Sequence, residues 1–195
     1  MKVVFPVMGA ENISVAYLST IVKNQGHESK VAFDRALFDD KQYFSVGFLH
    51  KLFDHKEKMI TAIIKERPDV LALSVFADNY QWALYVAKKV REKIPDCSTI
   101  WGGIHPTTVP EEVIRHDEVD FVVVGDGELP MIKVLDSLEN GKNFEGIPNL
   151  WFKKEGQVIK GPHSYLPEGQ EFPEPDKTVF ENFVPIEEYY LTDRK

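Results

Sequence analysis

The sequence has very little cysteine, because Cys97 is the single one among its 195 residues. One thiol cannot form a disulfide within the chain. It also cannot supply the several thiolates of a cysteine-based zinc site or of an iron–sulfur cluster. These 195 residues therefore exclude a disulfide framework among themselves and any metal cluster that they would hold by cysteines alone.

Long apolar runs and positive charge are also scarce. No stretch approaches the roughly 18 apolar residues of a membrane span, and the first eight residues carry one positive charge and too short an apolar run for a signal peptide. The chain has 23 basic and 31 acidic residues, a net charge of -8, and its lysines and arginines do not cluster along one face. We therefore expect a cytoplasmic chain that binds neither nucleic acid nor a membrane.

Several motifs of well-known active sites are missing as well. The pattern Gly-x-Gly-x-x-Gly does not follow the first predicted strand, and no Walker-type phosphate loop is present. Ser74 lacks the Gly-x-Ser-x-Gly context of a hydrolase nucleophile, and no two histidines have metal-ligand spacing. These absences argue against dinucleotide, nucleoside triphosphate and hydrolase chemistry, and no catalytic residue is predicted.

What the sequence does contain is a regular alternation of apolar strands and amphipathic helices. Strands are predicted at residues 3–7, 29–33, 69–75, 98–101 and 119–124. Helices are predicted after Asn12, at 55–66, after Asp78 or Asn79, at 110–115 and at 129–138. The run at 69–75 is continuously apolar, which indicates a strand covered on both faces. This alternation predicts βαβ crossovers and a parallel sheet, specifically an α/β, flavodoxin-like doubly wound sheet of order 2-1-3-4-5.

The composition changes after Gly146. Residues 149–153 and 157–160, joined through Glu155-Gly156, predict a β-hairpin. Prolines then recur without apolar periodicity, which is typical of a linker. We expect a flavodoxin-like domain at 1–146, an appended hairpin at 147–161, and a proline-rich linker at 162–195 that leads toward a further domain.

Glycines gather in the loops that follow the predicted strands. In an open parallel sheet, ligands bind beyond the carboxyl ends of the strands where the strand order reverses, here between the first and third strands. Gly9, Gly102, Gly103, Gly125 and Gly127 all fall in such loops. Because glycine lets the backbone approach a ligand closely, the clustering predicts a ligand crevice.

The residues alone leave simpler interpretations open. A glycine after a strand also serves merely to turn the chain. Asp126 and Glu128 also suit a plain helix start, as a cap and as a favourable charge, and together they would repel a bare phosphate. His105 suits a surface or supporting position as well as a ligand contact.

Three motifs, in this order, resemble the N-terminal cobalamin-binding domain of radical S-adenosylmethionine enzymes. They are Pro-Asp-Val-Leu-Ala-Leu-Ser-Val at 68–75, Trp-Gly-Gly-Ile-His-Pro-Thr at 101–107 followed by Pro-Glu-Glu-Val at 110–113, and Val-Asp-Phe-Val-Val-Val-Gly-Asp-Gly-Glu at 119–128. The resemblance runs from Met1 to about Gly161. The proline-rich tail resembles the connector to the radical S-adenosylmethionine barrel of that family.

The resemblance implies that the chain binds cobalamin, with the corrin ring over the loops and the nucleotide tail in the crevice beside the first and third strands. The contacts that it implies are Met8, Gly9, Ala10, Glu11, Asn12, Ser74, Val75, Phe76, Asn79, Tyr80, Gly102, Gly103, His105, Gly125, Gly127 and Glu128. In particular, the pair Gly102-Gly103 matches the glycines that let the tail pass close to the backbone.

Two departures from related proteins refine this implication. Methionine synthase and the mutases carry Asp-x-His-x-x-Gly after the first strand, whereas residues 7–13 of this chain contain no histidine, so no protein group is expected to ligate cobalt. The cluster motif Cys-x-x-x-Cys-x-x-Cys is also absent. A [4Fe-4S] cluster and S-adenosylmethionine would then belong to a C-terminal domain in cis.

The resemblance thus implies a parent methyltransferase or cyclase, and a cobalamin-binding part that does not turn over substrate by itself. The alternative is a non-enzymatic flavodoxin-like sensor, regulatory or scaffold module that does not bind cobalamin.

Overall fold

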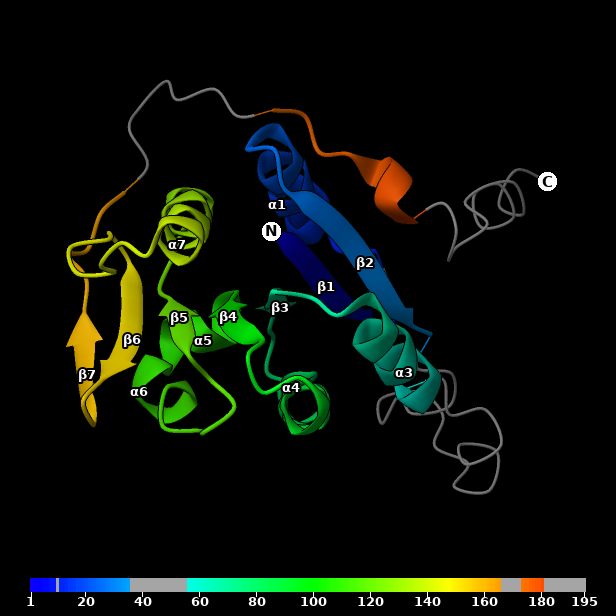
Figure 1. Cartoon of the computed structure of the whole chain (residues 1–195), viewed down its shortest axis with the longest axis horizontal. Helices are drawn as coiled ribbons and strands as arrows, with labels where there is room; N and C mark the ends of the chain where they lie inside the picture. Colours follow the sequence, from blue (N-terminus) through cyan, green and yellow to red (C-terminus); the bar gives the residue numbers. More distant parts are fainter. Residues whose placement is uncertain (10, 36–55, 166–172, 181–195) are drawn as a thin grey trace.

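The computed structural model describes residues 1–9, 11–35, 56–165 and 173–180. These residues form a seven-stranded sheet of order β2-β1-β3-β4-β5-β6-β7 (Figure 1). Strands β1 to β5 pair in parallel, and β6 and β7 are antiparallel. The predicted flavodoxin-like α/β fold and the order 2-1-3-4-5 are confirmed.

The predicted strands and helices that lie in the described ranges are all present. The strands are β1 (Lys2–Met8), β2 (Glu28–Asp34), β3 (Val70–Ser74), β4 (Ser98–Gly102), β5 (Phe121–Val123), β6 (Leu150–Lys154) and β7 (Gln157–Lys160). The helices are α1 (Ile13–Asn24), α3 (Lys56–Glu66), α4 (Tyr80–Lys93), α5 (Ile104–Thr108), α6 (Pro110–Val113), α7 (Glu128–Asn140) and the 3-10 helix η1 (Lys177–Phe180). Helix α5 was not predicted, and β5 is shorter than expected. None of the described helices is long and apolar enough to cross a membrane.

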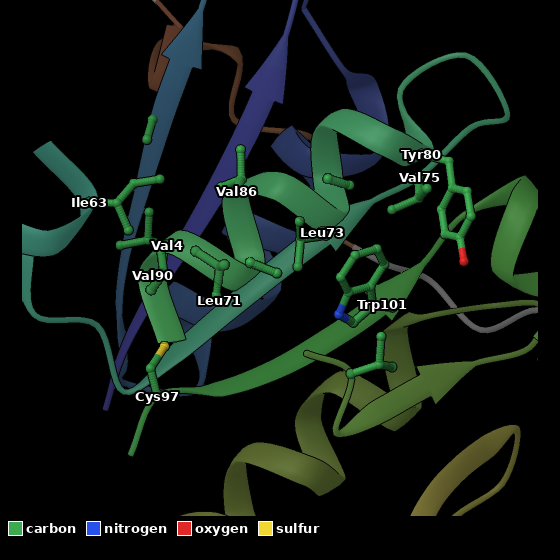
Figure 2. Packing of buried hydrophobic residues seen from close by; sticks show 14 of the residues in the cluster. Val4, Ile63, Leu71, Leu73, Val75, Tyr80, Val86, Val90, Cys97 and Trp101 are labelled. Carbon is green, nitrogen blue, oxygen red and sulfur yellow. The ribbon is translucent and has the colours of Figure 1, made fainter. Parts of the chain in front are cut away.

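Helices cover both faces of the parallel part of the sheet. Helices α1 and α7 lie on one face, and α3 and α4 lie on the other (Figure 1). Successive strand residues therefore enter different clusters: Val4 packs on the α3 and α4 side, whereas Val3 and Phe5 pack on the α1 and α7 side. Figure 2 shows the first cluster, in which Leu71 and Trp101 are fully buried. Burial on both faces explains the continuous apolar run of β3.

Side chains on the α1 and α7 face become smaller toward the carboxyl ends of two strands. In β3 the series is Val70, Ala72 and Ser74, and in β4 it is Ile100 and Gly102. Ser74 and Gly102 are register partners. The packing layer beneath α1 and α7 is therefore thin at this edge of the sheet.

The predicted hairpin is present and continues the sheet. Strand β6 pairs with β5, with Leu150 opposite Val123, and the turn places Glu155 and Gly156 at positive φ, as a two-residue hairpin requires. Leu150 and Phe152 are buried in the α1 and α7 cluster. The hairpin therefore shares its core with the predicted first domain.

Part of the predicted linker is docked against the sheet. The Asp176 carboxylate accepts a hydrogen bond from Lys23 Nζ at 2.8 Å, and its backbone N–H donates to Thr20 Oγ1 at 2.9 Å. Hydrogen bonds to its carboxylate lower the pKa of Asp176, and the one from Lys23 is the largest cause. Phe180 is buried in the same apolar cluster as α1, so residues 173–180 form a structured contact with α1 and β2.

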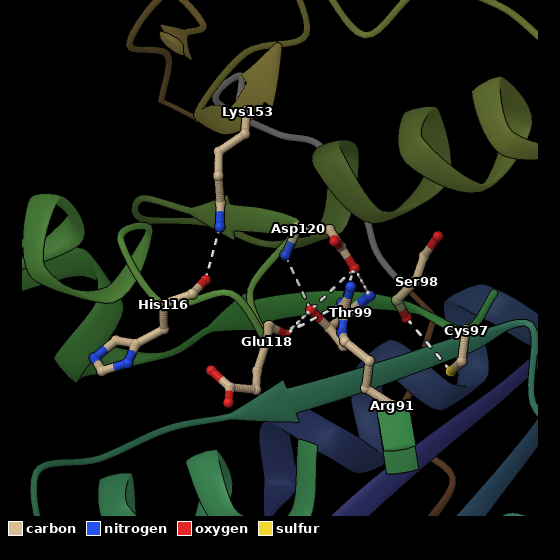
Figure 3. Close-up of polar contacts among 8 residues, drawn as sticks. All are labelled: Arg91, Cys97, Ser98, Thr99, His116, Glu118, Asp120 and Lys153. Carbon is tan, nitrogen blue, oxygen red and sulfur yellow. Dashed lines mark hydrogen bonds and ion pairs between the residues drawn. The ribbon is translucent and has the colours of Figure 1, made fainter. Parts of the chain in front are cut away.

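A polar network ties the amino-terminal end of β4 to β5 and α4 (Figure 3). The Asp120 carboxylate accepts hydrogen bonds from Arg91 and from the backbone N–H of Thr99. The Thr99 hydroxyl donates to the carbonyl of Glu118 at 2.7 Å. The network lies at the end of the sheet opposite the glycine-rich loops, so it stabilises the fold without entering the candidate site.

Replacing Asp120 by alanine should lower the free energy of unfolding by about 2–3 kcal/mol, because it removes the carboxylate that accepts from a part-buried guanidinium and from a backbone N–H. Urea denaturation measures this loss. Asp117→Ala removes an exposed carboxylate nearby and should change stability by less than about 0.5 kcal/mol. Equal effects of the two substitutions would contradict this role of the network.

Candidate functional site

A groove of about 400 Å³ opens at the carboxyl edge of the sheet, between the strands and helices α1 and α7. Its floor contains Ala72, Ser74 and Gly102, the small residues at which β3 and β4 lose bulk. The walls come from the beginnings of α1 and α7. The residues that they contribute are Ile13, Ser14, Tyr17, Leu18, Glu128 and Met131. The groove therefore exists because small side chains lie beneath two well-packed helices.

A second hollow of about 280 Å³ lies over the loops that follow β1 and β3. It is lined by Met8, Glu11 and Asn12 from one loop and by Phe76, Asp78 and Asn79 from the other, among others. The two hollows share Ile13, Ser14, Ser74 and Phe76. Together they form one site that extends across the point between β1 and β3 where the strand order reverses.

Asn12 joins α1 to the end of β3. Its side-chain oxygen accepts hydrogen bonds from the backbone N–H groups of Ser14 and Val15 at 3.0 and 3.2 Å, which caps α1. Its Nδ2 donates to Ser74 Oγ at 3.1 Å. The wall of the groove and its floor are thus fixed relative to each other by one side chain.

Asn79 performs a similar role for the loop after β3. It occupies the position before α4, where the sequence predicts a capping side chain at Asp78 or Asn79, but Asn79 forms no side-chain cap. Its side chain turns back instead, accepting from Phe76 N–H at 2.8 Å and donating to the Ser74 carbonyl at 3.3 Å. Ser74 is therefore contacted by two asparagines from two different loops.

The two glycines after β4 have different structural roles. Gly103 has φ +103°, and a Cβ there would lie 2.7 Å from the carbonyl oxygen of Val75. Glycine is therefore required at 103 by the approach of this loop to β3, although Gly103 also lines the groove. A Cβ on Gly102 would meet Val123 Cβ at 3.9 Å, an ordinary contact, so Gly102 keeps space open on the groove floor.

The loop after β5 brings two carboxylates to the start of α7. Gly125 adopts φ +96°, and its N–H donates to Thr107 Oγ1 at 3.0 Å. The N-cap position of α7 is Gly127, and no side chain caps the helix. Asp126 is exposed and therefore does not act as the predicted cap. Glu128 lines the groove, and its Oε2 is buried without a hydrogen-bond partner among the described residues.

Large apolar side chains are exposed around the mouth of the groove. Ile13 is 58% exposed, Ile104 is 63% exposed and Phe76 is 38% exposed, and all three line it. Grouped exposed apolar side chains at the rim of a cavity mark a binding surface. The arrangement suits a ligand with a broad, partly apolar body and a slimmer part that enters the groove.

The structure brings most of the predicted site residues together. Those that line the two hollows are Met8, Glu11, Asn12, Ser74, Phe76, Asn79, Gly102, Gly103, Gly125, Gly127 and Glu128. Four others, namely Gly9, Val75, Tyr80 and His105, do not line them. Ala10 lies outside the described residues.

Val75, Tyr80 and His105 belong to the opposite side of β3. Val75 is fully buried, and its neighbour Tyr80 lies in the same cluster, at the right of Figure 2. The rings of Tyr80 and His105 stand 4.2 Å apart. Burial, followed by the charge of Glu112, raises the pKa of Tyr80. These residues support the loops from behind.

The residues of α1 that form the groove wall were not predicted. Ile13 and Tyr17, and likewise Ser14 and Leu18, are four residues apart and share a helical face. That face lies beside the buried stripe of Val15 and Val22. Partial burial, with the nearby Glu128 charge as the second cause, raises the pKa of Tyr17, so its hydroxyl remains protonated at neutral pH.

The Cys97 thiol and groups of metal-ligating side chains are the remaining candidates for metal or nucleophilic chemistry. Burial raises the pKa of the Cys97 thiol to about 12, which leaves it protonated and unreactive at neutral pH. In residues 1–9, 11–35, 56–165 and 173–180, no three histidine, cysteine or acidic side chains are grouped to hold a metal ion.

Several known proteins are similar to this chain in sequence. An uncharacterized methyltransferase of Pyrococcus horikoshii is 27% identical over 151 residues, which cover 77% of this chain and 29% of that protein. The cobalamin-dependent radical SAM methyltransferase TokK of Streptomyces tokunonensis is 29% identical over 108 residues, 54% of this chain and 16% of TokK. This chain therefore spans less than a third of the length of these relatives.

A solved structure of the cobalamin-dependent S-adenosylmethionine radical enzyme OxsB, with aqua-cobalamin and S-adenosylmethionine bound, has a TM-score of 0.70 at 14% identity. The match covers 92% of this chain and 24% of OxsB, and at this identity it concerns the fold. The family model of the B12 binding domain matches residues 10–135, which are more than half of the chain. The match includes the ends of β3, β4 and β5 that line the groove. The chain belongs to the B12-binding domain family.

Proposed function

We propose that this chain is the cobalamin-holding part of a cobalamin-dependent radical S-adenosylmethionine enzyme, a methyltransferase or a cyclase. Family membership assigns cobalamin as the ligand. The observation that supports the proposal most strongly is the apolar-rimmed groove at the carboxyl edge of the sheet. The methyltransferases among the relatives support the class of the parent enzyme.

The residues present fit cobalamin in size and chemistry. The groove volume of about 400 Å³ lies within the range of small-molecule sites, and it suits the nucleotide tail rather than the whole cofactor. The exposed rim of Ile13, Phe76 and Ile104 offers apolar contact to a broad corrin ring outside. The open floor at Gly102 leaves room for the flat base of the tail.

The chain's own residues would bind and orient the cofactor. Ser74, held by Asn12 and Asn79, presents a fixed hydroxyl beside the groove floor. Ser14 and Tyr17 offer further polar groups on the α1 wall. When bound, cobalamin supplies the cobalt chemistry of methyl-group or radical transfer, and the protein supplies binding and orientation.

The first loop gives the metal no histidine. Residues 7–13 read Val-Met-Gly-Ala-Glu-Asn-Ile, so cobalt would take no imidazole ligand from this loop. His105 lies behind the loops, and its ring packs at a tilt against that of Tyr80. We infer that cobalt in this protein has no histidine ligand.

We further infer the division of the chain: a cobalamin-binding domain at 1–146, the hairpin at 147–161, and a connector at 162–195. A radical S-adenosylmethionine domain in cis would hold the [4Fe-4S] cluster and S-adenosylmethionine. The small share of each relative that this chain covers supports that arrangement. The docked segment at 173–180 would fix the middle of the connector on α1.

The purified chain, mixed with hydroxocobalamin and then desalted, should retain corrin absorbance at close to one equivalent. A visible spectrum measures the retained cofactor. His105→Ala should leave the cobalt absorption bands unchanged, because no histidine ligates the metal. Absence of retained corrin at micromolar concentrations would contradict cobalamin binding and favour a sensor or scaffold role.

Replacing Gly102 by leucine should weaken cobalamin binding roughly ten- to hundredfold, because the new side chain fills the groove floor. Gly102→Ala adds one methyl group and should have a smaller effect. Titration followed by absorbance gives both dissociation constants, and thermal unfolding checks that each variant folds.

The neighbouring position should respond differently. Gly103→Ala places a Cβ against the backbone of Val75 at a positive φ, so it should lower the unfolding temperature with or without cobalamin. If Gly102→Leu bound cobalamin as tightly as the original chain, the groove would not be the binding site.

A further inference from the structure

The Glu128 carboxylate occupies an unusual position in the groove. It belongs to the first residue of α7 and lines the groove together with Tyr17 and Leu18 of α1. Its Oε2 is inaccessible to solvent and has no hydrogen-bond partner among the described residues. A buried acceptor oxygen without a donor is unfavourable, so a donor from a bound ligand would satisfy it.

The neighbouring groups narrow the choice of donor. Asp126 precedes Glu128 by two residues and adds a second acidic group to the groove lining. Two carboxylates disfavour an approach by the phosphodiester of the nucleotide tail. The benzimidazole base, bonded through one nitrogen to the ribose, carries no N–H donor. Within the nucleotide, the ribose hydroxyls are therefore the groups that can donate to Glu128.

We propose that Glu128 is a specificity-determining residue that accepts a hydrogen bond from a ribose hydroxyl of the cobalamin nucleotide. The inference rests on the proposed binding of cobalamin in this groove. The Oε2 atom of Glu128 is inaccessible to solvent, whereas the rim residues proposed to meet the corrin ring are exposed. Glu128 therefore lies inside the groove, where the tail would bind, and not at the corrin ring.

The test compares cobalamin with cobinamide, a corrinoid that lacks the ribose, the phosphate and the base. Affinities of the 195-residue chain for both corrinoids are measured by absorbance titration. Glu128→Gln replaces the charged acceptor by a neutral one and should weaken cobalamin binding by about five- to tenfold, the difference between hydrogen bonds to charged and to neutral groups. Cobinamide affinity should change less than about twofold.

Glu139→Gln is the matched control, because it removes the same charge from an exposed glutamate of α7 that does not line the groove. It should leave the ratio of cobalamin to cobinamide affinity unchanged. Glu128→Leu, similar in size but without an acceptor, should reproduce the selective loss. Thermal unfolding of each variant separates loss of binding from loss of the fold.

The outcomes distinguish the inference from the proposed function. If the original chain binds neither corrinoid, the proposed function fails. If it binds cobalamin but Glu128→Gln changes nothing, or weakens both corrinoids equally, the assignment of Glu128 to the ribose fails while cobalamin binding stands.

Discussion

The site depends on one packing constraint, the loss of side-chain bulk along one face of two neighbouring strands. From Val70 to Ser74 in β3 and from Ile100 to Gly102 in β4, the side chains beneath α1 and α7 shrink toward the carboxyl edge. Since protein interiors are otherwise close-packed, this shrinkage leaves a groove. It does so at the reversal of strand order, where doubly wound sheets bind their ligands.

The polar groups around the groove hold its strands and loops in place. Two asparagines, from the loops after β1 and β3, both bind Ser74 and thereby fix the groove floor. Glycine at 103 lets the loop after β4 rest on the backbone of Val75. In the part of the chain that the structure describes, no cluster of side chains is suited to hold a metal ion. The contacts of Ser74 and Gly103 make the groove a preformed site that can hold and orient a ligand.

The alternation of apolar strands and helices predicted the parallel sheet and its strand order, because strands buried on both faces are continuously apolar. The turn at Glu155-Gly156 between two short strands predicted the hairpin. Helix α5 was missed because it is five residues long and contains Pro106. The sequence Gly102-Gly103 cannot reveal which glycine faces the groove and which faces Val75, since that depends on how closely β3 and the next loop approach. Similarly, Asn79 sits where a helix cap is expected, and only the folded loop shows that its side chain turns back. The ligand contacts themselves remain predictions.

The central claim is that the nucleotide tail of cobalamin lies in the groove while cobalt takes no nitrogen ligand from the protein. The most direct measurement is the electron paramagnetic resonance spectrum of the chain loaded with cob(II)alamin. We expect a spectrum without nitrogen superhyperfine splitting, because the benzimidazole is held in the groove and residues 7–13 contain no histidine. A spectrum with that splitting would show nitrogen bound to cobalt and would contradict the account.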